Sequence, residues 1–161
     1  SLGHHALADI KVKKIPKNNR YTAIGWREWV YLPTYKNFAL KAKVDTGART
    51  SALHATNIKE FEKKGEKWVR FKLHQNENHK IISSRLIKHK KITNSFGDTE
   101  IRPVIKMKIK IGQNSWSTEI TLTARSRMTY PMLIGRNSLM KKHLIHSHKS
   151  YMTGKNNLHK S

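Results

Sequence analysis

One strand-to-turn step constrains the fold more than any other segment of the chain. Residues 38–44 (Phe-Ala-Leu-Lys-Ala-Lys-Val) alternate largely between apolar side chains and lysines, the pattern of a half-buried β-strand. The strand runs directly into Asp45-Thr46-Gly47, so a carboxylate stands on a tight turn at a strand end. Gly47 lacks a side chain and allows other backbone to approach this turn closely.

The carboxylate of Asp45 is a candidate catalytic group. An Asp-Thr-Gly turn after an apolar strand is typical of pepsin-type proteases, in which donors of the turn hold the aspartate. We expect the hydroxyl of Thr46 to join the hydrogen bonds beneath Asp45. The other two aspartates, Asp9 and Asp98, do not follow an apolar strand. An ordinary strand-to-turn step is the alternative interpretation of this triplet.

A second motif follows later in the chain. Residues 130–139 read Tyr-Pro-Met-Leu-Ile-Gly-Arg-Asn-Ser-Leu. In retroviral-type aspartic proteases, two apolar residues and Gly-Arg-Asn follow the active-site turn at about this separation, lie beside the catalytic loop and lead into a short helix. We therefore expect Ile134, Gly135 and Arg136 near Asp45, with Gly135 permitting close packing and one or two helical turns over 137–143.

Both motifs, with Gly-Trp-Arg-Glu-Trp-Val at residues 25–30, resemble a bacterial retropepsin-like family labelled "ATP-dependent zinc protease". The resemblance runs from about Ile24 to Tyr151. It implies a small closed β barrel of retropepsin type, with Asp45 as the catalytic carboxylate and a short helix near the C-terminus. Some members are thought to trim glutamate tails that a ligase adds to a ribosomal protein. The resemblance thus implies an endopeptidase with an acidic or glutamylated protein substrate.

The residues themselves support neither the ATP nor the zinc of that label. The chain has no His-Glu-x-x-His, no cysteine and no glycine-rich phosphate loop, so we predict no cofactor and no metal. His143, His146 and His148 lie close together, a pattern that solvated basic surfaces also show. Members of the family tend to have an acidic residue where this chain has His146. If that residue takes part in catalysis, activity here is altered; if it is structural, the change is minor.

One Asp-Thr-Gly turn is not a complete active site. Aspartic proteases use two carboxylates that share one proton, because two such close charges cannot both ionise easily. A two-fold homodimer would bring two Asp45 residues together, so the enzyme hypothesis predicts a homodimer. A monomer would need another group. Asp98 is a poor candidate, and His146 or Glu28 are speculative ones.

Substrate binding is expected from the turn, the second motif and a hairpin. Residues 94–98 (Asn-Ser-Phe-Gly-Asp) form a turn between two predicted strands, where a retropepsin would have the flap that closes over substrate. An ordinary hairpin is the alternative. Arg27 and Glu28 are expected to form a local ion pair, and Arg49 and Arg136 to pair with acids near the site. The candidate substrate-binding residues are Ala48, Arg49, Phe96, Gly97, Ile134, Gly135 and Arg136.

Strand patterns separated by turn signals recur at short intervals and proline is rare, so the sequence predicts an all-β fold. The expected strands are 23–32, 38–44, 52–55, 68–73, 81–93, 100–111 and 116–123. We expect residues 1–20 to form a flexible basic arm, 21–152 the barrel domain and 153–161 a disordered tail.

Charge narrows the choice of partner. Lysines and arginines number 33 against 10 acidic residues, a net charge of +23 that attracts polyanions. The basic residues are spread along the chain, which has no zinc-finger spacing, no heptad-linked basic region and no aromatic RNA-binding signature. This favours an acidic substrate, with nonspecific nucleic-acid or ribosome association as a further expectation. The alternative function is a catalytically inactive basic β-barrel module that binds RNA or an acidic protein tail.

The sequence constrains the cellular location of the protein less than its fold. No apolar run approaches the roughly 18 residues that cross a bilayer, so we predict no transmembrane segment. Residues 6–8 (Ala-Leu-Ala) resemble the end of a signal peptide but lack its hydrophobic region. Cytoplasmic and periplasmic locations both remain open.

Overall fold

The computed structural model describes residues 21–124 and 129–154, and strands make up most of this part of the chain. The strands are β1 (Thr22–Gly25), β2 (Arg27–Leu32), β3 (Phe38–Val44), β4 (Ser51–His54), β5 (Thr56–Lys63), β6 (Glu66–Gln75), β7 (Asn78–Arg85), β8 (Lys88–Thr93), β9 (Thr99–Ile111), β10 (Asn114–Thr123), β11 (Met132–Ile134) and β12 (His143–His146). Two 3-10 turns, η1 (Pro33–Tyr35) and η2 (Arg136–Ser138), are the only helical segments among the described residues. The all-β prediction is confirmed.

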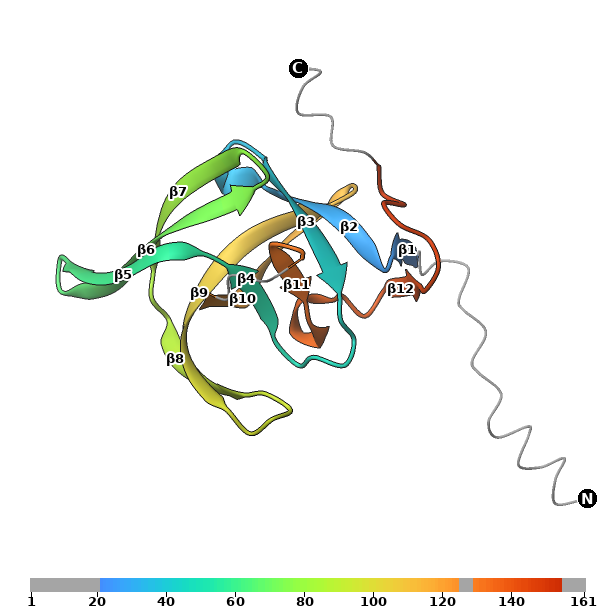
Figure 1. The fold of residues 1–161 in the computed structure, drawn as a ribbon. Coiled ribbons are helices and arrows are strands. Elements are labelled where there is room, and N and C mark those ends of the chain that lie inside the picture. Colours follow the sequence, from blue (N-terminus) through green and yellow to red (C-terminus); the bar gives the residue numbers. More distant parts are fainter. Residues whose placement is uncertain (1–20, 125–128, 155–161) are drawn as a thin grey trace, which may run out of the picture.

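Six strands form a closed barrel in the order β10-β4-β11-β3-β2-β9 (Figure 1). The long strand β9 closes it by antiparallel pairing with β10 from Val104 to Ile111, and its first half pairs with β8 instead. Two of the pairs, β3–β11 and β4–β10, are parallel. This confirms the predicted closed barrel.

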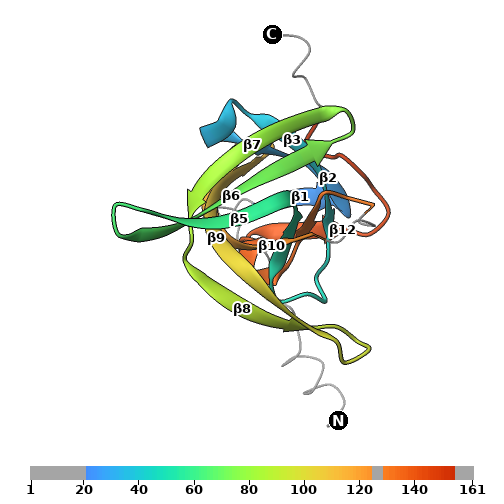
Figure 2. The ribbon, with the colours of Figure 1, turned by 60° about the vertical axis from the view of Figure 1, so that its left-hand side comes forward.

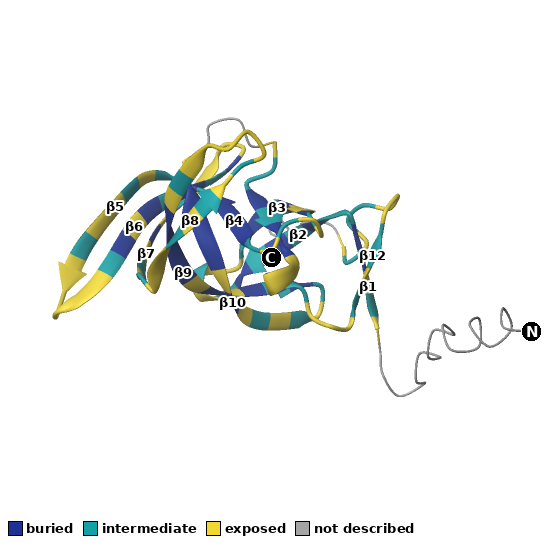
Figure 3. Ribbon diagram, turned by 90° about the horizontal axis from the view of Figure 1, so that it is seen from below, coloured by how far each residue is buried: buried dark blue, intermediate teal, exposed yellow. Residues whose placement is uncertain are grey.

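The barrel interior follows from the alternation of apolar residues. In β3, Leu40, Ala42 and Val44 are buried, as the period-two pattern predicts. In β9, Ile105, Met107, Ile109 and Ile111 are also buried. Burying a side chain such as Leu or Ile contributes about 1.5–3 kcal/mol, so these strands hold the barrel together by their inner faces (Figure 3).

Strands β5, β6 and β7 form a separate antiparallel sheet, whose β5–β6 hairpin projects away from the barrel (Figures 1 and 2). The single strand expected over 81–93 is therefore wrong, because the chain changes partner at Leu86–Ile87. The N–H of Leu86 donates to Lys67 in this sheet, whereas the N–H of Ile87 donates to Val104 in the barrel. The chain thus leaves one sheet and enters the other within two residues.

Two further expectations need correction. The strand expected over 23–32 is interrupted at Trp26, because β1 pairs with β12 and β2 pairs with β3. Helical structure expected over 137–143 is limited to the single turn η2. His143 instead begins β12, where it aligns with Thr22 in a parallel pair.

Glu28 is fully buried and holds the last described segment against the barrel. Its carboxylate accepts hydrogen bonds from the N–H of Gly25, the N–H of Met152 (2.9 Å), and both the N–H (3.1 Å) and the hydroxyl (2.8 Å) of Thr153. Thr153, which the sequence placed in the tail, is therefore hydrogen-bonded to the barrel.

The local ion pair expected between Arg27 and Glu28 is wrong, since adjacent strand residues point to opposite faces. The Arg27 guanidinium donates to Ser150 (2.9 Å) and to the hydroxyl of Tyr130 (3.0 Å). The bond to Tyr130 raises the pKa of Arg27 above its usual value. In the described part of the chain, no helix has the length and apolar character to cross a membrane.

Candidate active site

Asp45 lies at the end of β3, next to the second motif. Ile134 of β11 aligns with Val44, and the Ile134 carbonyl accepts the N–H of Asp45 at 2.8 Å. The sequence motifs, far apart along the chain, are therefore adjacent in a parallel strand pair. The barrel core anchors this pair, because Val44 and Ile134 are both buried.

The turn that follows is closed by its own backbone. Oδ1 of Asp45 accepts the N–H of Gly47 at 3.1 Å, and the Asp45 carbonyl accepts the N–H of Ala48 at 3.2 Å. Asp45 is partly buried, whereas Thr46 and Gly47 are exposed. The carboxylate is thus oriented through one oxygen at the surface of the barrel.

The segment after β11 clamps the same turn from the other side. Arg136 donates its N–H to the carbonyl of Ala48 (2.8 Å) and its guanidinium to the carbonyl of Thr46 (2.9 Å). The N–H of Asn137 donates to the carbonyl of Arg49 (3.0 Å). The expectation that Arg136 pairs with an acid is wrong, since its guanidinium binds the backbone of the turn.

A buried hydroxyl network supports the clamp, and no sequence pattern predicts it. The Ser51 hydroxyl accepts the N–H of Gly135 (2.9 Å), donates to Oδ1 of Asn137 (3.0 Å) and contacts the hydroxyl of Ser138. Thr118 of β10 in turn contacts Ser138 at 2.7 Å. Serine and threonine are common in turns, so only the fold distinguishes these from ordinary polar residues.

The role expected for Thr46 is not seen. Within the described residues the Thr46 side chain has no hydrogen bond. Only its backbone carbonyl takes part, as the acceptor of the Arg136 guanidinium. The residue is exposed because the turn points outward from the barrel, so its hydroxyl cannot reach the buried network.

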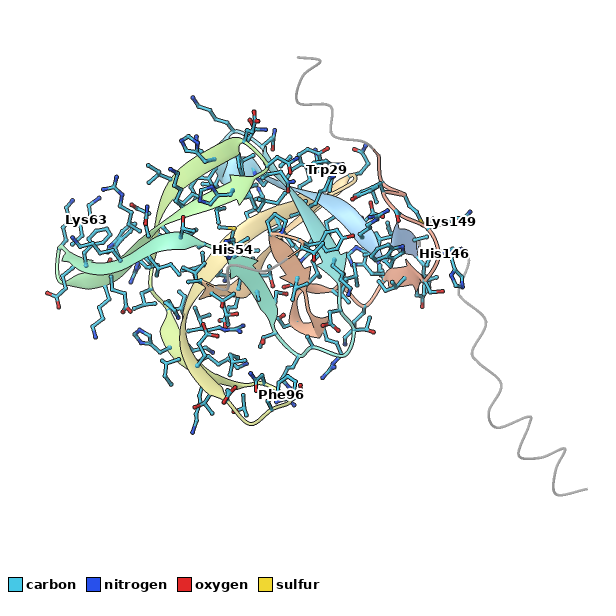
Figure 4. All side chains as sticks on the ribbon, viewed as in Figure 1. Trp29, His54, Lys63, Phe96, His146 and Lys149 are labelled. Carbon is cyan, nitrogen blue, oxygen red and sulfur yellow. The ribbon has the colours of Figure 1, made fainter. Side chains whose placement is uncertain are left out.

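The β8–β9 hairpin extends away from the barrel with Phe96 at its tip (Figure 4). Phe96 is 90% exposed, and Gly97 has φ of +86°, a conformation that favours glycine. Oδ1 of Asn94 accepts the N–H groups of Phe96 and Asp98, so Asp98 belongs to this turn. The structure therefore groups Ala48, Arg49, Ile134, Gly135 and Arg136 around Asp45, and places Phe96 and Gly97 on a separate hairpin.

His143, His146 and His148 are not grouped as metal ligands in the described part of the chain. β12 ends at His146, so His146 and His148 do not share a strand face, and their ring centroids lie 6.3 Å apart. Nδ1 of His146 accepts the N–H groups of His148 and Lys149. Across residues 21–124 and 129–154, no three His, Cys, Asp or Glu side chains are grouped as metal ligands would be. Glu28 cannot serve as a second catalytic carboxylate, since both its oxygens are occupied by hydrogen bonds.

Two pockets differ in their relation to Asp45. A pocket of about 700 Å³ includes Trp29, Tyr35 and Phe38, and lies at the end of β3 opposite Asp45. A smaller one of about 200 Å³ includes Arg49 of the turn and Lys90 of β8. Of these two, only the smaller pocket is lined by a candidate site residue, so it is the better candidate for substrate binding.

A closed barrel with one Asp-Thr-Gly turn clamped by a Gly-Arg-Asn segment defines a retropepsin-like protein. Residues 23–156 match the RimB-like family, described as retropepsin-like aspartic endopeptidase RimB, and the chain belongs to this family.

The chain is also similar to curated relatives and to a solved structure. The chain is 43% identical over 135 residues to a probable alpha-L-glutamate ligase of Shewanella pealeana, and 37% identical over 139 residues to one of Parasynechococcus marenigrum. The matches cover 81% and 84% of this chain but only 30% of either relative, so the chain spans about a third of their length. A crystal structure of a Legionella pneumophila protein of unknown function has a TM-score of 0.70 and 29% identity, covering 82% of this chain and 98% of that one.

Proposed function

We propose that the protein is an aspartic endopeptidase in which Asp45 pairs with Asp45 of a second copy. The observation that carries the proposal is the double clamp on the turn. β11 holds its start through Ile134, and the Arg136 segment holds its middle. A carboxylate fixed this way is preorganised for catalysis, since it does not need to be ordered when substrate binds.

The chemistry requires the two carboxylates to share one proton. The ionised Asp45 removes a proton from a water molecule, which attacks the scissile carbonyl carbon. The protonated Asp45 donates a hydrogen bond to the carbonyl oxygen and then its proton to that oxygen. As the tetrahedral intermediate collapses, one of its hydroxyl groups returns a proton to the second carboxylate, the C–N bond breaks, and the proton held by the first carboxylate passes to the leaving amine. The two carboxylates therefore act as one catalytic unit.

Dimerisation is part of the proposal because the described residues supply only one such turn. Thr46 and Gly47 are exposed, and the turn faces outward, so a second copy can approach it along a two-fold axis. The specific activity of a dimer-dependent enzyme rises with protein concentration until the dimer saturates.

The substrate that fits best is an acidic or glutamylated protein. A net charge of +23 favours acidic substrates through its field. The relatives named as glutamate ligases contain a segment similar to this chain, which links the family to glutamate addition. This link supports a glutamate tail as the substrate that is cleaved.

Cleavage of a glutamate-tailed protein by wild type, Asp45→Asn and Asp98→Asn tests the proposal, across pH 4 to 8 and with and without a chelator. We expect Asp45→Asn to abolish turnover and keep the fold, Asp98→Asn to remain active, and the chelator to have no effect. Full activity in Asp45→Asn would overturn the proposal.

The second candidate, a basic module that binds RNA or an acidic tail without cleaving it, is favoured by the same charge. It predicts no turnover by wild type at concentrations that give a dimer. Binding would then be insensitive to Asp45→Asn and would fall steeply as salt rises.

A further inference from the structure

We propose that the 200 Å³ pocket beside the catalytic turn is a subsite for one acidic side chain of the substrate, with Arg49 and Lys90 determining its specificity. The inference rests on the proposed function, because it assigns the pocket to a chain bound across Asp45. It goes further by naming the residues that would distinguish glutamate from its neutral isostere glutamine.

The position of the pocket is the first argument. Arg49 belongs to the turn that begins at Asp45, and the Arg49 carbonyl is fixed by the N–H of Asn137. The opposite wall comes from Lys88 and Lys90, which alternate along β8 and share one face of it. The pocket therefore lies between the catalytic turn and β8, the strand that leads to the Phe96 hairpin.

Two of the three neutral polar side chains of the wall, those of Asn137 and Thr121, are already hydrogen-bonded. The Asn137 amide donates to the carbonyl of Glu119 and accepts the N–H of Ser51. The Thr121 hydroxyl donates to the carbonyl of Ser51 at 2.9 Å. These groups hold the wall together, which leaves the charged residues and the Thr50 hydroxyl to recognise a ligand.

The balance of charge in the pocket favours an anion. Lys88 is paired with Glu119 at 3.3 Å, which cancels one positive charge. Arg49 and Lys90 have no acidic partner among residues 21–124 and 129–154. Two positive charges thus remain for a single carboxylate, and an arginine guanidinium binds a carboxylate with two parallel hydrogen bonds.

Size and polarity fit a glutamate side chain. A volume of about 200 Å³ leaves room for the five non-hydrogen atoms of that side chain. Val104 supplies an apolar surface for its methylene groups.

Binding of a fluorescent oligoglutamate peptide and of its oligoglutamine counterpart, measured in an Asp45→Asn background, tests the subsite without turnover. Arg49→Gln and Lys90→Gln are compared with two control variants that each lose one positive charge elsewhere. Lys91→Gln changes the next residue of β8, which faces the other way, and Arg70→Gln changes an exposed arginine of the β5–β6–β7 sheet. All four variants lose one positive charge, so the long-range field changes equally.

We expect Arg49→Gln and Lys90→Gln to weaken oligoglutamate binding about tenfold each, and oligoglutamine binding less than twofold. Lys91→Gln and Arg70→Gln should change both less than twofold. Equal weakening by all four variants would overturn the subsite, as would wild-type-like binding by Arg49→Gln and Lys90→Gln.

Turnover by the protein without the Asp45 substitution separates this proposal from the proposed function. No cleavage together with the expected binding pattern would refute the endopeptidase and keep the carboxylate subsite. If the protein cleaves its substrate, and Arg49→Gln and Lys90→Gln prefer glutamate over glutamine as strongly as wild type does, the endopeptidase is kept and the subsite is refuted.

Discussion

Gly135 lies so close to Thr50 that no side chain fits between them. A Cβ on Gly135 would stand 2.5 Å from the carbonyl carbon and oxygen of Thr50, and 3.0 Å from the carbonyl oxygen of Ala48. Both neighbours are backbone and cannot rotate away. This contact allows Arg136 to reach the Asp45 turn, because it brings the two segments within hydrogen-bond range.

Gly135→Ala should therefore destabilise the protein by about 3 kcal/mol or more, since relief of the clash needs movement of the backbone. Chemical denaturation measures the effect. Gly65→Asn is the control, because Gly65 has φ of +76°, open space around it and a conformation that asparagine tolerates. A Gly135→Ala protein as stable as the control variant would contradict the steric argument.

Glu28→Gln should lower the free energy of unfolding by about 2–4 kcal/mol, because glutamine presents an NH₂ group to a site that contains only donors. Urea titration measures this. Glu62→Gln changes an exposed carboxylate of β5 and should stay within about 0.5 kcal/mol of wild type. Equal effects of the two substitutions would show that the buried carboxylate contributes no more than a surface charge.

Arg136→Ala removes the bond to the Thr46 carbonyl and keeps the backbone bond to Ala48. We expect a change of stability below about 1 kcal/mol, because the side chain is exposed, and faster amide hydrogen exchange at Gly47. In the proposed enzyme kcat should fall about tenfold with little change of KM. Unchanged amide hydrogen exchange at Gly47 would show that the Arg136 side chain does not help to position the turn.

His143 makes stability depend on pH. Burial lowers the pKa of His143 below its usual 6.5, and its Nδ1 accepts the N–H of Met140, which favours the neutral ring. The unfolded chain therefore binds more protons between the two pKa values, so the free energy of unfolding falls as pH drops through that window. Stability at pH 7 and pH 5 should differ less in His143→Gln than in wild type. Equal differences would refute this.

The sequence predicted the strand that ends at Asp45 well because its signal is local. The alternation over Phe38–Val44 depends only on which face is buried, and β3 has those bounds. The adjacency of Ile134 to Asp45 was also predictable, but only from the resemblance to retropepsins. Nothing in the composition of either segment indicates that they pair.

What the sequence missed depends on contacts between distant residues. The change of sheet at Leu86–Ile87 occurs inside a continuous strand pattern, and only the available partners decide it. The partners of Glu28 are likewise invisible, because a glutamate in a strand is most often exposed and here lies entirely buried. The hydroxyls of Ser51 and Ser138 give no pattern at all.

The bonds from Met152 and Thr153 to Glu28 join positions 124 and 125 residues apart in the chain. During synthesis Glu28 leaves the ribosome long before these donors do. Its carboxylate must therefore stay hydrated while the intervening strands are made, because burial without these partners carries a large desolvation cost. The closing of this end of the domain is consequently a late step of co-translational folding, and a chain halted before residue 152 would leave the Glu28 carboxylate without the donors of Met152 and Thr153.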